Sequence, residues 1–209
     1  SKYVKYSMDS KGYITISGFN GGMEKVVIPG MIDGHPVTVI GKGAFMGCKD
    51  LVEVYMPDQI LTMQGNAFSD CINLKKIHLS NNISKIVAKS FSGCIGLKDI
   101  NIPDGVTEIK KSTFSDSPLE RLHIGKSLAS IASNLFYNGK YDLRAGRQIT
   151  TRAINKITVD PANPYLAAVG SLVLSKDGKT LYAALGNKRS ISIPEGVETI
   201  SSSAFENLI

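Results

Sequence analysis

Three cysteines and three histidines are the residues whose types could do chemistry in this chain. Cys48, Cys71 and Cys94 recur every 23 residues, and repeated thiols could form a disulfide or bind a metal. If each repeat is one coil of a stack, successive thiols lie about 5 Å apart, and three thiols in line cannot all pair. Ser117 takes the next place in the series. We therefore interpret the cysteines as free buried thiols, and no Cys-x-x-Cys zinc pattern competes with this interpretation.

The histidines form no catalytic pattern. His78 and His123 fall at equivalent repeat positions two coils apart, so their rings would start about 10 Å apart, too far for a shared metal ion with bonds of about 2 Å. The sequence contains no nucleophile elbow, zinc-protease motif, phosphate-binding loop or dinucleotide fingerprint. The repeat also places no acid or base beside a positioning partner. We therefore predict a protein that is not an enzyme and that needs no metal or cofactor.

A cluster of basic residues lies in an insertion within the repeats. This segment, 138–156, follows Phe136 and has Asp142 as its one acidic residue. Two interpretations stay open. The insert could be a solvated loop, or it could bind an anionic partner such as an acidic protein patch, a sulfated glycan or nucleic acid, which the net charge of +6 also favours. Its basic residues are Lys140, Arg144, Arg147, Arg152 and Lys156.

The elements that must position these residues come from the 23-residue repeat. Phe45, Phe68, Phe91 and Phe114 recur at this interval, and each is followed by a run of the type Leu-x-x-Ile-x-Ile. Such a run is a short strand whose alternate residues point inward. No copy can bury both its Phe and its strand face alone. The period therefore predicts a solenoid of stacked coils with one internal spine of phenylalanines.

Three segments resemble the BspA-like, Treponema-type leucine-rich repeats: 44–51 (AFMGCKDL), 100–109 (INIPDGVTEI) and 193–205, which begins IPEGVETI and ends in Ala-Phe. The resemblance covers most of residues 26–209. It implies a mainly β, right-handed superhelix with a sheet on one face and short helical or irregular turns. It also implies a secreted or cell-surface, adhesin-like protein that attaches to a host or matrix protein.

One elongated domain is predicted, because the repeat runs across nearly all of the 209 residues. We expect a hairpin cap and lead-in at 1–36, with a strand at 12–16 and a turn at Asn20-Gly21-Gly22. Regular repeats follow at 37–137, then the basic insert at 138–156. Residues 157–209 add further repeats and an inserted hairpin at 169–182, with Asp177-Gly178 at its turn.

The ends of the chain carry two further expectations. The last unit stops at Ile209 without a cap, so we expect the parent protein to continue, and the chain could be a scaffold segment of it. No signal peptide opens the chain. No apolar stretch approaches the length of about 18 residues that a membrane span needs, so no membrane insertion is predicted.

The repeat builds an exposed sheet face with two columns of side chains. The first column runs Tyr55, His78, Asn101, His123, Thr158 and Ser192, and the second runs Glu53, Lys76, Asp99, Arg121 and Lys156. Opposite charges on neighbouring rungs could pair and hold the stack in register, each pair contributing about 0.2–1 kcal/mol. That structural role and a binding role both stay open.

We hypothesise that this face binds a protein, because Tyr, His, Arg and Asn on a rigid surface suit such contacts. A host or extracellular-matrix protein is the first choice of partner, a glycan the second, and no nucleic acid is expected. The predicted contact residues are Tyr55, His78, Asn101, Arg121 and His123.

Overall fold

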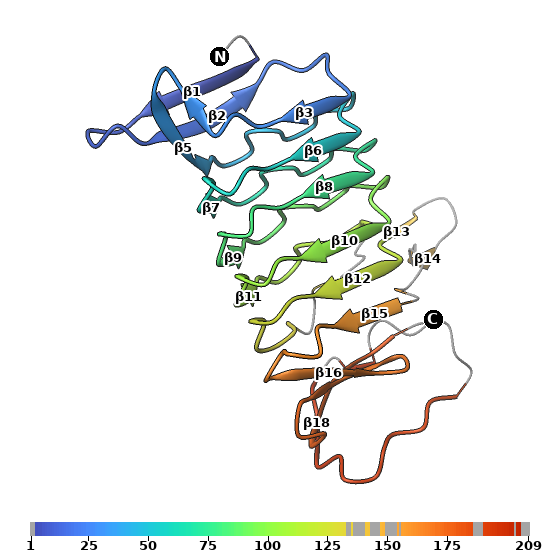
Figure 1. Cartoon of the computed structure of the whole chain (residues 1–209). Helices are drawn as coiled ribbons and strands as arrows, with labels where there is room; N and C mark the ends of the chain where they lie inside the picture. The colour runs from blue at the N-terminus through green and yellow to red at the C-terminus, as the bar shows by residue number, and fades with distance from the viewer. Residues whose placement is uncertain are drawn as a thin grey trace.

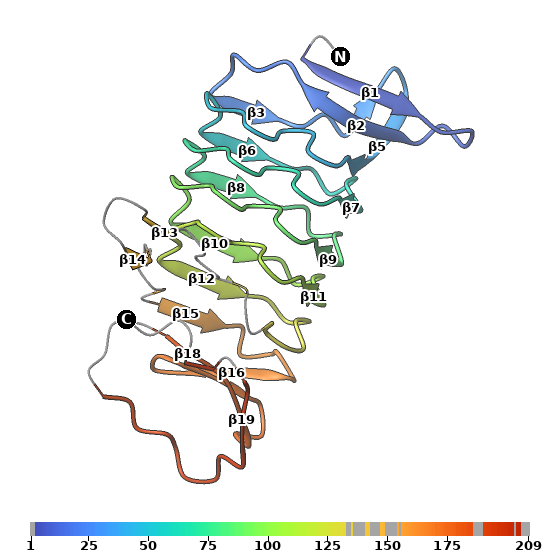
Figure 2. The same ribbon diagram turned by 180° about the vertical axis from the view of Figure 1, so that it is seen from behind.

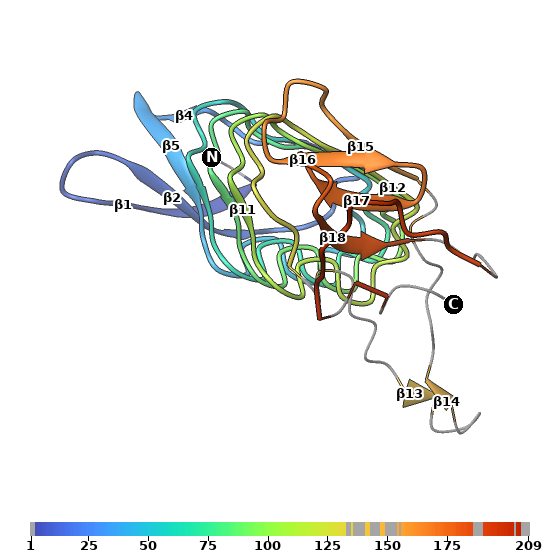
Figure 3. The same ribbon diagram turned by 90° about the horizontal axis from the view of Figure 1, so that it is seen from below.

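Short strands joined by turns make up the chain in the computed structural model (Figure 1). The structure describes residues 3–132, 135, 154, 156–185, 190–202 and 204–205, and the backbone of two short strands at 141–142 and 147–148. No segment within these residues is helical, so the turns that were expected to be partly helical are irregular. Successive coils stack one below another, and the view along the stack shows them superimposed (Figure 3).

One side of each regular coil is a short parallel strand. These strands form two three-stranded sheets: β3 (Lys25–Val27), β6 (Glu53–Tyr55) and β8 (Lys76–His78), then β10 (Asp99–Ile102), β12 (Arg121–Ile124) and β15 (Lys156–Val159). β10 follows β8 in the same stack (Figure 1). A second line of shorter strands lies farther along each coil: β7 (Thr62–Met63), β9 (Lys85–Ile86) and β11 (Glu108–Ile109) (Figure 2). The chain is therefore a mainly β solenoid.

The N-terminal cap differs from our prediction. Its strands are β1 (Val4–Met8), β2 (Ile14–Phe19), β4 (Met31–Ile32) and β5 (His35–Ile40). The predicted turn at Asn20-Gly21-Gly22 is wrong, because β2 pairs with β1 across residues 9–13, and β3 joins the parallel sheet. Sequence reasoning missed β1, although Val4, Tyr6 and Met8 alternate with polar residues, a signal that could have identified it as a strand.

Beyond β15 the regular stack gives way to a small sheet. It consists of β16 (Leu166–Val169), β17 (Leu172–Ser175), β18 (Thr180–Ala184) and β19 (Thr199–Ile200). β17 and β18 are antiparallel and flank the Asp177-Gly178 turn. β19 pairs with β18 in parallel. A separate antiparallel pair is formed by β13 (Tyr141–Asp142) and β14 (Arg147–Gln148).

Stacked phenylalanines run through the core. Phe45, Phe68, Phe91 and Phe114 are fully buried, with ring centroids 4.9, 5.9 and 5.7 Å apart along the stack and interplanar angles of 9–13°. This arrangement confirms the predicted spine. Phe19 of β2 extends it, with its centroid 5.2 Å from that of Phe45. Phe136, the expected fifth member, lies outside the described residues.

Each Phe sits in a tight turn that needs the left-handed backbone conformation twice. Two residues before the Phe, φ is 64° at Gly43, 60° at Asn66 and at Lys89, and 58° at Ser112. Two residues after it, Gly or Asp again has φ between 58° and 72°. Left-handed backbone favours Gly and tolerates Asn and Asp, whereas Lys has no such preference. The turn geometry is therefore kept even where the sequence does not favour it.

The cysteines fill a repeated hydrogen-bonding position beside this spine. The Cys71 thiol donates to the carbonyl of Phe45 (2.9 Å), and the Cys94 thiol donates to that of Phe68 (3.0 Å). The Ser117 hydroxyl continues the ladder to Phe91 at 2.5 Å. All three cysteines are free, as predicted. Cys48 is only half-buried, because the N-terminal cap, and not another Phe turn, precedes its coil.

Candidate functional site

The first column of the exposed sheet face is apolar at one end and polar at the other. Val27, Tyr55 and His78 stand opposite one another on β3, β6 and β8. Val27 is 73% and Tyr55 51% exposed, and the Tyr55 ring lies 5.6 Å from the His78 ring, centroid to centroid. On the next three strands the column continues with Asn101, His123 and Thr158.

Ion pairs cross the second column. Glu53 lies between Lys25 (3.3 Å) and Lys76 (3.5 Å), and the Lys25 hydrogen bond is the largest of the causes that lower the pKa of the Glu53 carboxyl. Arg121 binds Asp99 through two nitrogens, with Nη2 2.6 Å from Oδ2. This hydrogen bonding raises the pKa of Arg121. The predicted pairing of neighbouring charges is thus present in both sheets.

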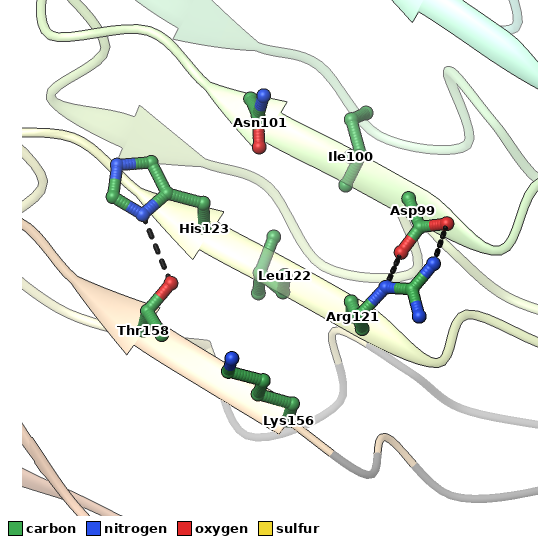
Figure 4. Close-up of a pocket in the computed structure, with 8 residues that line it drawn as sticks. All are labelled: Asp99, Ile100, Asn101, Arg121, Leu122, His123, Lys156 and Thr158. Carbon is green, nitrogen blue, oxygen red and sulfur yellow. Dashed lines mark hydrogen bonds and ion pairs between the residues drawn. The ribbon is translucent and has the colours of Figure 1, made fainter.

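Two shallow depressions lie along the first column, and one of them extends across to the second column. One, of about 250 Å³, has Tyr55, His78 and Asn101 in its lining. The other, of about 200 Å³, is lined by Asn101, Arg121 and His123 among others (Figure 4). The two share Asn101. The structure therefore brings all five predicted contact residues to one continuous strip of the sheet face.

The second depression has walls of hydrogen-bonding side chains. His123 Nδ1 lies 2.9 Å from the hydroxyl oxygen of Thr158 on one side, and the Asp99–Arg121 pair forms the other side (Figure 4). The Lys156 side chain lies between these two pairs (Figure 4). The arrangement can donate hydrogen bonds and offer positive charge to a bound group.

Not every predicted site residue joins this face. Ser192 was expected to continue the first column, but it lies in no strand. The reason is that β16, β17 and β18 form an antiparallel sheet whose free edge is taken by β19, so the segment around Ser192 does not continue the ladder in the described structure. In the basic insert, Lys140, Arg144 and Arg152 lie outside the described residues. For Arg147 only the β14 backbone is described, and Lys156 opens β15.

Sequence reasoning missed two residues of the face, Lys25 and Val27. They belong to the first rung, which had been assigned to the cap. The segment 25–29 reads Lys-Val-Val-Ile-Pro, so it carries the same inward-outward-inward pattern followed by Pro as the later segment 99–103. That pattern was the signal that could have identified β3 as a rung.

In the part of the chain that the structure describes, no three His, Cys, Asp or Glu side chains are grouped so that they could hold a metal ion. No helix among those residues is long and apolar enough to cross a membrane.

A solenoid of short strands with an exposed parallel face defines the class of leucine-rich-repeat proteins. Comparison with known families is consistent with this class, because the family described as BspA type leucine rich repeat region matches residues 20–142 and 175–209 in six copies. The match covers well over half of the chain. The protein therefore belongs to the BspA-type leucine-rich-repeat family, which confirms the resemblance found in the sequence.

Solved structures of bacterial leucine-rich-repeat proteins are similar to the chain. A leucine rich cell surface protein from Faecalibacterium prausnitzii is 31% identical over 65% of this chain, with a TM-score of 0.57. The leucine rich repeat protein of T. pallidum is 26% identical over 59% of the chain, with a TM-score of 0.51. The pneumococcal vaccine antigen PcpA matches 98% of the chain and 60% of its own length at 20% identity and a TM-score of 0.65, which shows a shared fold alone.

The coverage of these relatives is partial. The chain spans 35% of the F. prausnitzii protein and 70% of the T. pallidum protein. No curated protein matches the chain.

Proposed function

We propose that this chain is a non-catalytic interaction module that binds a protein through its parallel sheet face. The observation that carries the proposal is that Tyr55, His78, Asn101, Arg121 and His123 line two depressions that meet at Asn101. The strands are stacked on a closely packed core, which holds these residues in a fixed arrangement. Little conformational entropy is therefore lost on binding. Exposed Tyr and Arg side chains are also the residue types that most often dominate binding energy in protein interfaces.

The setting we propose is the bacterial cell surface or the secreted fraction, with a host or matrix protein as partner. The F. prausnitzii relative, which is a cell surface protein, supports this setting at 31% identity. The chain covers 35% of that protein, so the proposal does not extend to how the relative is anchored or to what it binds. Attachment would require shape and charge complementarity only, with no chemical step.

Capture by immobilised extracellular-matrix proteins tests the proposal. We expect the double variant Tyr55→Ala with Arg121→Ala to lose at least about tenfold in affinity for a captured partner, because each side chain is exposed on the proposed contact strip. A matched control removes Lys11 and Tyr13, which are exposed in the N-terminal hairpin away from the strip. Unchanged capture by the double variant would show that another surface binds the partner.

Salt dependence separates this proposal from its alternative. Charge contacts at an exposed loop are screened beyond about 8 Å at physiological ionic strength. Capture of sulfated glycans alone, lost when salt is raised, would place the binding site in the basic insert 138–156. Salt-resistant capture of a protein would favour the sheet face.

A further inference from the structure

The charges on the sheet face do not cancel. Across the six rungs from β3 to β15, the outward side chains include four basic residues and two acidic ones, which leaves an excess of two positive charges with the histidines neutral. The basic residues are Lys25, Lys76, Arg121 and Lys156, and the acidic residues are Glu53 and Asp99. A surface of this kind suits a partner with the opposite charge.

Each of the two sheets has one positive charge in excess, but the basic residues are partnered differently on each. Lys25 and Lys76 both contact Glu53, so the β3–β6–β8 sheet holds its charges in ion pairs. On the β10–β12–β15 sheet, Arg121 lies directly opposite Lys156 in the ladder. The Asp99 carboxylate of this sheet is already bound to Arg121. Within the described residues, Lys156 forms no ion pair. Like charges at opposed positions destabilise a sheet. An anion bound beside Arg121 and Lys156 would therefore reduce a repulsion that is present in the free protein.

The depression beside Lys156 has the size and the donors for a small anionic group. Arg121 uses Nε and Nη2 to bind Asp99, which leaves the Nη1 donors for a ligand. The Asn101 side chain forms no hydrogen bond within the described part of the chain, and the Lys156 side chain lies between the walls (Figure 4). A volume of about 200 Å³ is below the range of about 300–1,000 Å³ that is usual for pockets of drug-sized ligands. It fits one side chain of a larger partner.

We infer that this depression receives the carboxylate of an Asp or Glu side chain from an acidic segment of the protein partner. Lys156 is its charge partner, and Arg121 and Asn101 are its hydrogen-bond donors. This inference rests on the proposed function of the face. A sulfated polyanion fits less well, because the carboxylates of Glu53 and Asp99 alternate with the cations and would repel a chain of negative charges laid along the column.

Fluorescence anisotropy with a short labelled peptide of alternating glutamate and serine tests the inference, at low and physiological salt. A glutamine–serine peptide is the uncharged reference. We expect the glutamate peptide alone to bind, and Lys156→Gln to weaken it about fivefold, as for the loss of one exposed ion pair. Asp99→Asn should tighten binding, because it removes a repelling carboxylate and frees Arg121.

Lys25→Gln is the matched control. It removes the same charge from the same column, but five rungs away, about 24 Å at the usual strand spacing. That separation exceeds the screening length of about 8 Å, so binding of the peptide should stay unchanged. Equal weakening by Lys25→Gln and Lys156→Gln would reveal general charge attraction and overturn the inference. Absence of binding at low salt would do the same.

Two further outcomes keep this inference separate from the proposed function. Binding of a heparin-derived oligosaccharide that depends on Lys156, without binding of the glutamate peptide, would overturn the assignment to a protein carboxylate. A matrix protein captured through Tyr55 and Arg121, but unaffected by Lys156→Gln and Asp99→Asn, would overturn the inference and leave the binding face standing. Far-ultraviolet circular dichroism of each variant would check that it is folded.

Discussion

At the scale of single residues, the cysteines are structural donors. Each thiol of the ladder satisfies the Phe carbonyl of the preceding coil, and Ser117 does the same with a hydroxyl. Burial is the largest cause that raises the pKa of the Cys94 thiol, to about 12, and the pKa of Cys71 is raised by its hydrogen bond with Cys48 and by burial. The buried thiols therefore stay protonated and unreactive at neutral pH.

This protonation predicts a loss of stability in alkali. An unfolded thiol ionises with a pKa of about 8.5, whereas folded Cys94 keeps its proton up to a pH of about 12. Over that window the unfolded state binds fewer protons, so the free energy of unfolding should fall by about 1.4 kcal/mol per pH unit for each such thiol. We expect Cys94→Ser to remove one such contribution from the pH dependence.

Urea unfolding at several values between about pH 8 and about pH 10 measures this effect. Ser117→Ala serves as the control, because it changes the equivalent ladder position and removes no thiol. A Cys94→Ser slope equal to that of the parent protein would refute the assignment of the alkaline loss to this thiol.

At the scale of elements, the Phe turn is the most demanding part of the repeat. Its left-handed positions are filled by glycine in some copies and by Lys89 or Ser112 in others, with almost the same φ. The turn conformation is therefore imposed by the coil packed on either side of it, since the local sequence of those copies does not favour it. Local strain of this kind can be relieved by substitution.

Lys89→Gly should stabilise the protein by up to about 1.5 kcal/mol. Left-handed backbone costs a non-glycine residue about 1–2 kcal/mol, and the larger entropy of glycine in the unfolded chain offsets about 0.5–1 kcal/mol of the gain. The opposite change, Gly93→Ala, should destabilise, because φ is 72° there and the new Cβ would collide with the Asp70 carboxylate. Thermal melts of both variants check the pair, and a lower melting temperature for Lys89→Gly would contradict this account.

At the scale of the whole molecule, stability depends on neighbouring coils. The phenylalanine stack joins five rings in a line, four from the Phe turns and one from β2, so each coil buries its ring against the next. Interactions in such a solenoid are made between nearest neighbours. A defect in the middle of the stack should therefore weaken the contact on both sides of it.

Phe68→Ala is the corresponding prediction. The ring is fully buried between those of Phe45 and Phe91, so its removal should cost about 3–5 kcal/mol. Urea unfolding should also become broader, because the coils on the two sides are less tightly coupled. Phe68→Leu fills more of the space and should cost less. A melt of Phe68→Ala that coincides with that of the parent protein would argue against the spine.

Much of the regular stack could be predicted from the sequence, because the repeat and the strand alternation are local properties. The fourth copy is one residue out of step, yet Asn101 pairs with His123 and Asp99 with Arg121 as the pattern predicts. The buried Phe spine follows from the period and the free thiols from the place of Cys in each repeat, whereas the family was indicated by the residues of three segments that resemble it. The binding role of the face stays a prediction.

Only the tertiary structure decided what happens where the repeat stops. β3 became a rung because Val26 pairs with Val54, and Ser192 left the face because β19 took the edge of β18. Two features of the face depend in the same way on which strands are neighbours. They are the ion pairs of Glu53 with two lysines and the depression beside Lys156. A period specifies contacts between copies of itself. Contacts between unlike segments depend on packing that no repeat encodes.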